Sequence, residues 1–190
     1  MQIQKYRRLF DGKSFLRENK ETSMKEKQLF DGGGKARILP LIKQSIEKYD
    51  AIRVLDYGCG YGNDWHMRLV PDGKGKKITT PELFGEKLVG FHRYDPAYHL
   101  YSADPPGLFN LIICTDVMEH VLMKDIPEVL KHIQSKCTTD GTVLFSIPTK
   151  PSKNAFLDGE NMHCTVMNAQ EWKETIGRYL KRNNIINAYG

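Results

Sequence analysis

The sequence lacks any hydrophobic run long enough to cross a membrane, and it lacks a paired-cysteine motif. No window approaches the ~18 apolar residues that a transmembrane helix requires, and the opening MQIQKYRRLF has no apolar stretch like that of a signal peptide. The four cysteines form no C-x-x-C pair, so we expect reduced thiols. These absences predict a cytoplasmic protein without a membrane span.

Negative charge is scarce in the first quarter of the chain. The 190 residues carry a formal net charge of +5, and residues 1–48 hold twelve Lys and Arg against six Asp and Glu. Glycine-broken, polar sequence up to residue 34 predicts a basic N-terminal arm over 1–34, irregular or partly helical, before a single domain over 35–190. The arm is either a patch for nucleic acid or another anionic surface, or a solvated segment. No basic and aromatic alternation accompanies the charge, which favours the solvated segment.

Short apolar runs alternate with amphipathic segments through the rest of the chain. Strands alternating with helices predict an α/β fold whose sheet is mostly parallel and covered by helices on both faces. Capping-box patterns mark two of the helices, at Asp125 with Glu128 and at Asn168 with Glu171. We expect strands at 52–58, 87–95, 109–115 and 142–148, and helices beginning near Pro40, Asp125 and Asn168.

Two connections between these strands depart from a regular alternation. Only thirteen residues, 96–108, separate the second strand from the third, which is too short for a helix and a further strand. The sheet should therefore be compact, with a shortened middle region. From Asp56 to Asp95 there are 39 positions, whereas a minimal strand-helix-strand unit needs about 20 between the corresponding residues. We therefore expect an inserted loop over residues 70–88.

Glycines at alternate positions follow the first strand. They let a backbone turn sharply and approach a ligand without a side chain in the way. Asn63 stands where a dinucleotide-binding turn has its last glycine, and no phosphate-binding lysine follows. An acidic residue before so tight a turn favours a ligand with a positive group and no phosphate. The turn comprises Asp56, Tyr57, Gly58, Gly60 and Gly62.

The run VLDYGCGYG resembles the first motif of class I S-adenosylmethionine-dependent methyltransferases, of the type 11 or 12 kind. The resemblance implies a Rossmann-like methyltransferase sheet, a transferase activity and S-adenosylmethionine as cofactor. In that family the glycine turn lies under the methionine and ribose, and an acidic residue ending the second strand binds the ribose hydroxyls; Asp95 is the matching residue. The implied cofactor contacts are Asp56, Tyr57, Gly58, Gly60, Gly62, Asp95, Thr115 and Asp116.

Ionisable residues crowd the end of the third strand in TDVMEH. If the chain turns helical at once, Asp116, Glu119 and His120 share one face. The pattern resembles the E-x-x-E-H element of metal-assisted O-methyltransferases, with Asp116 in place of the first glutamate. That resemblance implies Mg²⁺, Mn²⁺ or Fe²⁺ bound by Asp116, Glu119, His120 and the downstream His163. Relatives with D-V-x-E-H but no known metal leave the other interpretation open, in which Asp116 and Thr115 border the cofactor and Glu119 pairs locally.

The segment GENMHCTV carries a narrower resemblance, to bacterial and phage methyltransferase-like proteins often associated with polysaccharide genes. Asn161, His163 and Thr165 alternate as strand side chains would, so they face either one way into the pocket or outward on an exposed hairpin. We expect O-methylation of a small-molecule, glycan or lipid-linked acceptor, with Glu119, His120 and His163 as catalytic residues. Two alternatives stay open: an RNA methyltransferase that uses the basic arm, and a non-catalytic protein that binds S-adenosylmethionine.

Overall fold

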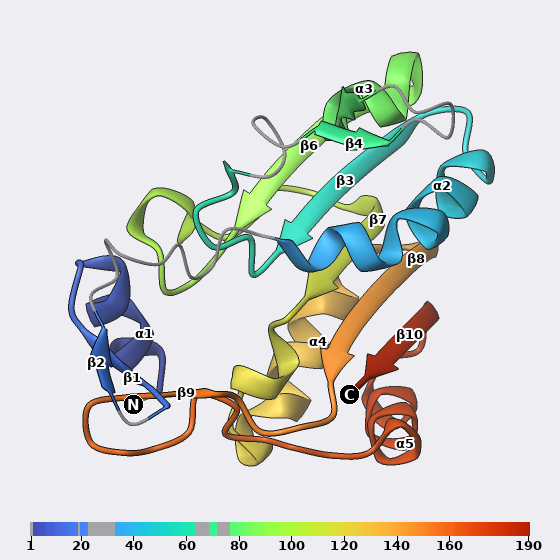
Figure 1. The fold of residues 1–190 in the computed structure, drawn as a ribbon. Coiled ribbons are helices and arrows are strands. Elements are labelled where there is room, and N and C mark those ends of the chain that lie inside the picture. Colours follow the sequence, from blue (N-terminus) through green and yellow to red (C-terminus); the bar gives the residue numbers. More distant parts are fainter. Residues whose placement is uncertain (1, 19, 23–32, 64–68, 72–76) are drawn as a thin grey trace.

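A five-stranded sheet forms the centre of the molecule, in the order β10-β8-β7-β3-β6 (Figure 1). The computed structural model describes residues 2–18, 20–22, 33–63, 69–71 and 77–190. Every pair of neighbouring strands in this sheet is parallel, which confirms the α/β, Rossmann-like fold. The strands are β3 (Ile52–Tyr57), β6 (Leu88–Tyr94), β7 (Phe109–Thr115), β8 (Cys137–Pro148) and β10 (Asn183–Tyr189).

Helices cover both faces of the sheet, because β7 and β8 are apolar on both sides and need two layers of cover. Helix α2 (Leu39–Glu47) lies on one face, and α4 (Ile126–Lys136) and α5 (Ala169–Tyr179) lie on the other (Figure 1). Each helix buries an apolar stripe, such as Ile42 and Ile46 of α2. Separate core clusters result on the α4–α5 face and on the α2 face.

Some predicted boundaries differ from the structure. The capping box of α5 forms, with Asn168 accepting hydrogen bonds from the N–H groups of Gln170 and Glu171. Asp125 stands at the N-cap of α4, but its side chain makes no capping hydrogen bond. Strand β8 begins at Cys137 and includes the expected TTDG turn, which coincides with a register irregularity against β7. Strand β10 was not expected, because its sequence NNIINAY is rich in asparagine, a poor strand former.

The two unusual connections are built as follows. Residues 96–108 contain one 3₁₀ turn, His99–Tyr101, and no helix or strand, so the middle of the sheet is short. The expected insertion at 70–88 contains a hairpin of β4 (Leu69–Pro71) and β5 (Lys77–Thr79), then α3 (Thr80–Phe84) and a 3₁₀ turn, Gly85–Lys87. Residues 72–76 of that insertion lie outside the described residues.

Residues 2–18 and 20–22 pack onto the C-terminal part of the chain. Helix α1 (Gln2–Phe10) is followed by β1 (Phe15–Arg17), which pairs with β2 (Lys20–Thr22) and with β9 (Asn154–Ala155). A small core joins Tyr6, Leu9 and Phe15 to Phe156 and Met162. A 3₁₀ helix, Gly33–Ile38, leads into α2. The boundary expected at residue 34 stays a prediction, because residues 23–32 lie outside the described part. Within that part, no helix is both long and apolar enough to cross a membrane.

Candidate active site

A cavity of about 1350 Å³ opens beyond the carboxyl ends of β3, β6 and β7. This is the switch point of the sheet, because the chain runs from β3 to β6 on one side and then crosses from β6 to β7 on the other side of β3. A pocket that binds one small ligand typically has a volume of about 300–1,000 Å³. The cavity therefore has room for a cofactor and part of a second substrate.

The glycine turn after β3 and the end of β6 meet at this cavity. The N–H groups of Gly58 and Cys59 donate to the Tyr94 carbonyl at 2.7 and 3.1 Å, and Gly60 N–H donates to Asp95 Oδ2 at 2.9 Å. The second carboxylate oxygen of Asp95 accepts from Ala97 N–H at 2.8 Å. The two strand ends that the sequence singled out are therefore joined by direct hydrogen bonds.

Gly58 must be a glycine because Val117 approaches its Cα closely. Its φ is +75°, and a Cβ placed there would lie 2.2 Å from Val117 Cγ2, on the segment that follows β7. Gly60 also has a positive φ, of +57°, and both glycines line the cavity. Gly62, with φ +65°, does not line it; a Cβ there would meet Arg93 Cδ at 2.6 Å. Gly62 shapes the turn away from the cavity.

Asp56 is also directed away from the cavity. Its carboxylate pairs with Lys35 Nζ at 3.0 Å, and both side chains are buried. Successive strand side chains point to opposite faces, so the neighbouring Tyr57 faces the α4 side and reaches the cavity wall. Of these two expected cofactor contacts, the structure brings only Tyr57 to the cavity.

Asp95 keeps acceptor capacity for a ligand. Burial raises the pKa of its carboxyl group, and the N–H groups of Ala97 and Gly60 oppose that shift. A carboxylate offers about four acceptor positions, and the two hydrogen bonds given above leave room for a further donor. Its place on the cavity wall, beside two glycines, suits a hydroxyl-bearing ligand.

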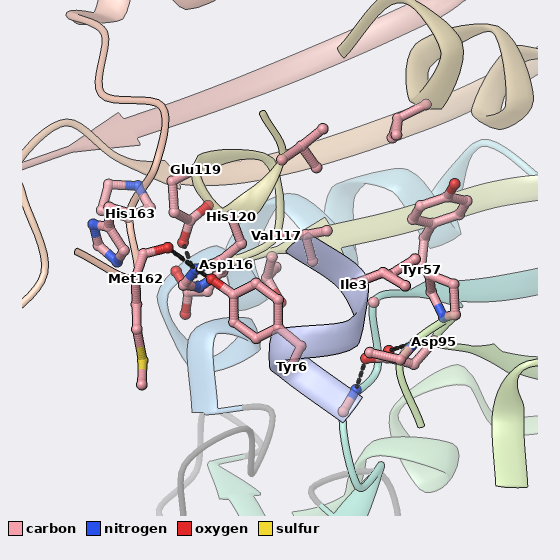
Figure 2. Close-up of a pocket in the computed structure, with 18 of the residues that line it drawn as sticks. Ile3, Tyr6, Tyr57, Asp95, Asp116, Val117, Glu119, His120, Met162 and His163 are labelled. Atoms are coloured by element: carbon pink, nitrogen blue, oxygen red, sulfur yellow. Dashed lines mark hydrogen bonds and ion pairs between the residues drawn. The ribbon is translucent and has the colours of Figure 1, made fainter. Parts of the chain in front are cut away.

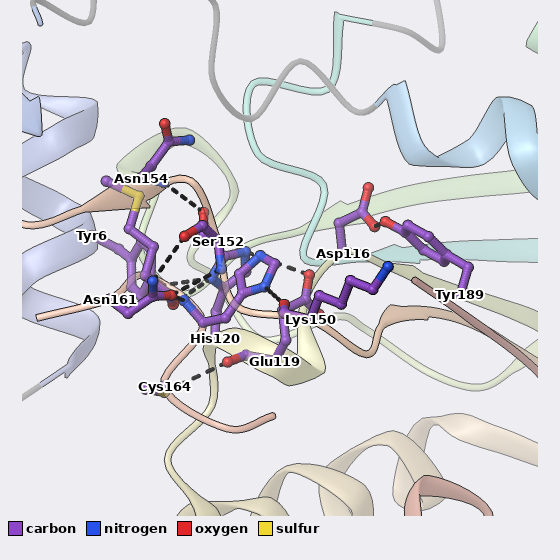
Figure 3. A network of polar contacts seen from close by, with 12 residues as sticks. Tyr6, Asp116, Glu119, His120, Lys150, Ser152, Asn154, Asn161, Cys164 and Tyr189 are labelled. Carbon is purple, nitrogen blue, oxygen red and sulfur yellow. Dashed lines mark hydrogen bonds and ion pairs between the residues drawn. The ribbon is translucent and has the colours of Figure 1, made fainter. Parts of the chain in front are cut away.

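Asp116 does not begin the expected helix. Its φ of +55° is left-handed, and a 3₁₀ turn, Met118–His120, follows. The side chain accepts a hydrogen bond from Arg37 at 3.0 Å. It accepts another from the Tyr189 hydroxyl (Figure 3). Arg37 in turn lies over the Tyr189 ring at 4.4 Å. Asp116 and Thr115 line the cavity, but Asp116 is not grouped with Glu119 and His120 on one helical face.

Glu119, His120 and His163 converge at one end of the cavity (Figure 2). One potential ligand atom from each lies within 4.8 Å of the other two. The two imidazole rings are 5.1 Å apart, and His120 Nε2 lies 3.6 Å from Glu119 Oε1. Glu119 is fully buried, and neither carboxylate oxygen has a hydrogen-bond partner among the described residues. We call these three residues the Glu-His-His cluster.

Backbone carbonyls orient both imidazoles of the cluster. His120 Nδ1 lies 2.8 Å from the Met162 carbonyl, and His163 Nδ1 lies 2.7 Å from the Lys150 carbonyl. A carbonyl can only accept, so each Nδ1 carries the hydrogen and each neutral ring keeps its lone pair on Nε2. This is the arrangement in which histidines bind metals or accept protons.

Burial sets the charge of the cluster. It raises the pKa of Glu119 well above its ordinary value, and the nearby charge of Asp116 adds to this. Burial also lowers the pKa of His120 to about 4, although the hydrogen bond to the Met162 carbonyl raises that pKa. At neutral pH the cluster therefore holds an uncharged imidazole beside a carboxyl group that resists ionisation.

The segment that carries His163 is not a strand beyond one bridge at Asn161. Asn161 Oδ1 accepts from the N–H groups of Ser152 and His163 at 3.0 and 2.9 Å (Figure 3). Thr165 is buried and donates its hydroxyl hydrogen to the Val121 carbonyl. The three alternating residues therefore do not share one face; His163 lines the cavity, while Asn161 and Thr165 hold the backbone around it.

Residues that the sequence did not indicate also reach the cavity. The Tyr6 hydroxyl, from α1, donates to the Met162 carbonyl at 2.7 Å and lies 2.7 Å from His120 Nδ1. Arg37 and Tyr189 reach the wall through their contacts with Asp116. Tyr6 is separated from His120 by 114 positions, so no local pattern could have linked the two.

A comparison of the sequence with known protein families agrees with the fold and the cavity. Over residues 1–181 the sequence matches the family described as methyltransferase domain. The chain belongs to this methyltransferase family. No curated protein and no solved structure matches the methyltransferase. Membership confirms the expected transferase class and implies S-adenosylmethionine as the methyl donor.

The residues of the methyltransferase fit that cofactor. Gly58 and Gly60 line the wall with backbone that carries no side chain, and a Cβ at Gly58 would collide with Val117. Asp95 can still accept hydrogen bonds beside them. A nucleoside bearing hydroxyls and a positively charged sulfonium suits this combination of open backbone and carboxylates.

Proposed function

We propose that the methyltransferase transfers the methyl group of S-adenosylmethionine to a hydroxyl oxygen of a small-molecule, glycan or lipid-linked acceptor. The observation that carries the proposal is the Glu-His-His cluster, in which a buried carboxyl group has no hydrogen-bond partner among the described residues and faces two imidazole lone pairs. An unpaired buried polar group of this kind costs about 1–3 kcal/mol or more. Strongly perturbed ionisable groups in a cleft mark functional sites.

In this proposal Gly58 and Gly60 bind the methionine and ribose through their backbone, Asp95 binds the ribose hydroxyls, and Thr115 and Asp116 border the cofactor. The cofactor supplies an activated methyl group bonded to a sulfonium, which leaves as a neutral thioether. The chain holds the acceptor oxygen in line with that group and excludes water, since alignment accounts for much of the rate of such transfers.

The acceptor hydroxyl must also lose its proton. His120 and His163 each present a bare Nε2 to the cavity, so either imidazole can accept that proton as a general base. Glu119 Oε1 lies 3.6 Å from His120 Nε2, so the imidazolium that forms lowers the pKa of Glu119, and the ionised carboxylate then stabilises the imidazolium.

A divalent metal ion at the cluster is the alternative route to deprotonation. One carboxylate and two imidazoles with open positions beside them fit Mn²⁺ or Fe²⁺ better than Mg²⁺, which prefers oxygen ligands. The Met162 and Lys150 carbonyls would serve as outer partners of the two histidines. Asp116 is left out of this ligand set, because Arg37 and Tyr189 occupy its carboxylate. A bound ion would lower the pKa of an acceptor hydroxyl.

Calorimetry with S-adenosylhomocysteine tests the cofactor site. We expect the wild-type protein to bind it, and Asp95→Asn to bind it at least roughly tenfold more weakly, because a neutral amide accepts ribose hydrogen bonds less strongly than a carboxylate. The control Asp50→Asn changes an exposed acidic residue on the turn before β3 and should leave the affinity unchanged. Absence of binding by the wild-type protein would refute the proposed function.

Manganese titration followed by electron paramagnetic resonance tests the metal route separately. We expect one Mn²⁺ bound by the wild-type protein, none by Glu119→Gln, and one by the control Glu174→Gln, whose residue lies exposed on α5. If the wild-type protein binds no Mn²⁺ at millimolar concentration, the metal route is refuted and the histidine base remains.

A second candidate is an RNA acceptor. The basic helix α1 favours it, since Arg7 and Arg8 lie on the same helix as Ile3 and Tyr6, which line the cavity. RNA binding that weakens steeply between 50 and 200 mM salt would support this candidate, and binding insensitive to salt would refute it. Binding of S-adenosylhomocysteine without methyl transfer to any acceptor class would instead favour a non-catalytic binding protein.

A further inference from the structure

Three aromatic rings line the other end of the cavity, and none has a role in the proposed reaction. Tyr57 ends β3, Tyr94 ends β6 and His132 lies on α4. The ring centroids are 5.1 Å apart between Tyr57 and Tyr94, 5.4 Å between Tyr94 and His132, and 5.7 Å between Tyr57 and His132. We call these residues the ring cluster. Tyr57 is buried, whereas Tyr94 and His132 stay partly exposed on the cavity wall.

The orientation of His132 is fixed by a chain of hydrogen bonds. Its Nε2 donates to Asp104 Oδ1 at 2.8 Å, and its Nδ1 accepts from the Tyr57 hydroxyl at 2.9 Å. Lys136 also binds Asp104 and so holds that carboxylate against α4. Asp104 belongs to the short connection between β6 and β7. These contacts hold that connection, which has no helix of its own, against α4.

The order of groups along the cavity decides what this end can bind. In Figure 2 Tyr57 and Asp95 lie on one side, and Glu119, His120 and His163 lie on the other. If Asp95 binds the ribose, the sulfonium side of the nucleoside must extend toward the Glu-His-His cluster, where the acceptor is. The base is attached to the opposite side of the ribose, so it extends away from that cluster. The ring cluster is the wall that it meets.

An acidic side chain stands beside the ring cluster. Glu128 is four residues before His132 on α4, so the two side chains are neighbours on one helical face. Glu128 lines the cavity, is exposed, and makes no hydrogen bond or ion pair with the described residues. A carboxylate can accept hydrogen bonds from an amino group, such as the exocyclic amine of adenine, and repels a carbonyl oxygen at the same place.

We infer that Tyr94 and His132 form the aromatic wall against which the adenine of S-adenosylmethionine packs, with one ring against the face of the base and the other, tilted by 60°, against its edge. We further infer that Glu128 accepts a hydrogen bond from the exocyclic amine. The inference rests on the proposed function and deepens it, because it names the residues that select the base. Stacking on aromatic side chains tolerates any base, whereas an acceptor beside the amine discriminates adenine from hypoxanthine. Glu128 is therefore the residue that determines specificity, and Asp104 and Tyr57 position His132.

Calorimetry with two probes tests the inference, S-adenosylhomocysteine and its analogue S-inosylhomocysteine. The wild-type protein should prefer the adenine probe by about tenfold, the effect of one charge-assisted hydrogen bond. Glu128→Gln should lose most of that preference, while His132→Leu should bind both probes roughly tenfold more weakly and keep the preference. Glu174→Gln, an exposed glutamate of α5, is the matched control and should behave as wild type. Equal binding of both probes by the wild-type protein would overturn the role of Glu128.

A nuclear Overhauser measurement on the wild-type complex supplies a readout that does not depend on the folding of any variant. Contacts between the adenine H2 or H8 protons and the rings of Tyr94 or His132 are expected. Bound S-adenosylhomocysteine without these contacts would overturn the inference and leave the proposed function standing. A wild-type protein that binds neither probe would overturn both.

Discussion

Glu119 is a carboxyl group held where water does not reach. It has no hydrogen-bond partner among the described residues, and burial raises its pKa. Below the unfolded-state pKa of 4.5 both states are protonated, so the burial has no pH-dependent effect. Above it the unfolded state releases the proton first, and stability falls as pH rises toward the folded-state pKa. The chain keeps a residue that weakens its own folding, as functional groups often do.

Replacing Glu119 with glutamine should therefore stabilise the protein in metal-free buffer. At pH 8 we expect Glu119→Gln to unfold with a free energy at least about 1 kcal/mol higher than wild type, since each unit of pKa shift corresponds to about 1.4 kcal/mol. The difference in unfolding free energy between the variant and wild type should vanish as pH falls to 4.5. Urea unfolding of both proteins at several pH values measures this difference. His120 also titrates, but it does so in both proteins. A difference in unfolding free energy that stays constant from pH 4.5 to 8 would contradict the raised pKa of Glu119.

The hydroxyl group of Tyr6 can be removed without removing the ring. In Tyr6→Phe the ring still packs against His120 and Phe156, but the bond to the Met162 carbonyl is lost. Loss of an outer partner of a metal-binding histidine lowers metal affinity about 10–100-fold. We expect about tenfold weaker Mn²⁺ binding and unchanged affinity for S-adenosylhomocysteine. Tyr49→Phe, which removes a hydroxyl bonded to Asp140 and Thr142, is the control. Equal Mn²⁺ affinities in the two variants would remove Tyr6 from the site.

At the scale of elements, the glycine turn was predictable and the turn after β7 was not. Apolar runs and glycine spacing are local patterns, and they identified the ends of β3 and β6 and the convergence of Gly58, Gly60 and Asp95. Aspartate tolerates the left-handed backbone found at Asp116, but nothing in the local sequence distinguishes it from an aspartate that begins a helix. This conformation accompanies contacts with Arg37 and Tyr189, which are far away in the chain. The interpretation of TDVMEH as one helical face was consequently right for Glu119 and His120, which the structure brings together, and wrong for Asp116.

The glycine turn makes a sharp prediction about stability. Gly58→Ala adds a Cβ 2.2 Å from Val117 Cγ2 in a left-handed backbone, so we expect a loss of about 2–4 kcal/mol in unfolding free energy. Gly12→Ala has a similar φ of +81° with nothing within 4 Å, and should lose only the strain, about 1–2 kcal/mol. Urea unfolding compares them.

The collision can be separated from the strain by a second substitution. In the double variant Gly58→Ala with Val117→Ala, the two closest atoms, Val117 Cγ2 and Cγ1, are gone. The effect of adding the Gly58 methyl group should then fall most of the way to that of Gly12→Ala when each is compared with its own parent, because only the Val117 Cβ, 3.2 Å away, remains in close contact. An undiminished effect in the Val117→Ala background would show that the contact is not responsible.

At the scale of the whole molecule, the cavity is assembled from segments that are distant in the sequence. Helix α1, the ends of β3, β6 and β7, the segment 148–163 and Tyr189 all contribute to its wall. The sequence could predict the contributions that follow strands of the parallel sheet, because the carboxyl ends of such strands share one edge. It could not predict α1, whose basic residues suggested a solvated arm, because only tertiary packing places Tyr6 beside His120.

This division of the cavity predicts that two ligands stabilise the protein independently. S-adenosylhomocysteine should bind between Asp95 and the ring cluster, and Mn²⁺ at the Glu-His-His cluster. Each at 100 times its dissociation constant should add about 2.7 kcal/mol to the free energy of unfolding. The homocysteine compound carries no sulfonium charge to repel the ion, so the two effects should add, as urea unfolding with each ligand and with both will measure. If Mn²⁺ gives no further stabilisation once S-adenosylhomocysteine is bound, the two ligands compete for one site and the assignment of separate ends fails.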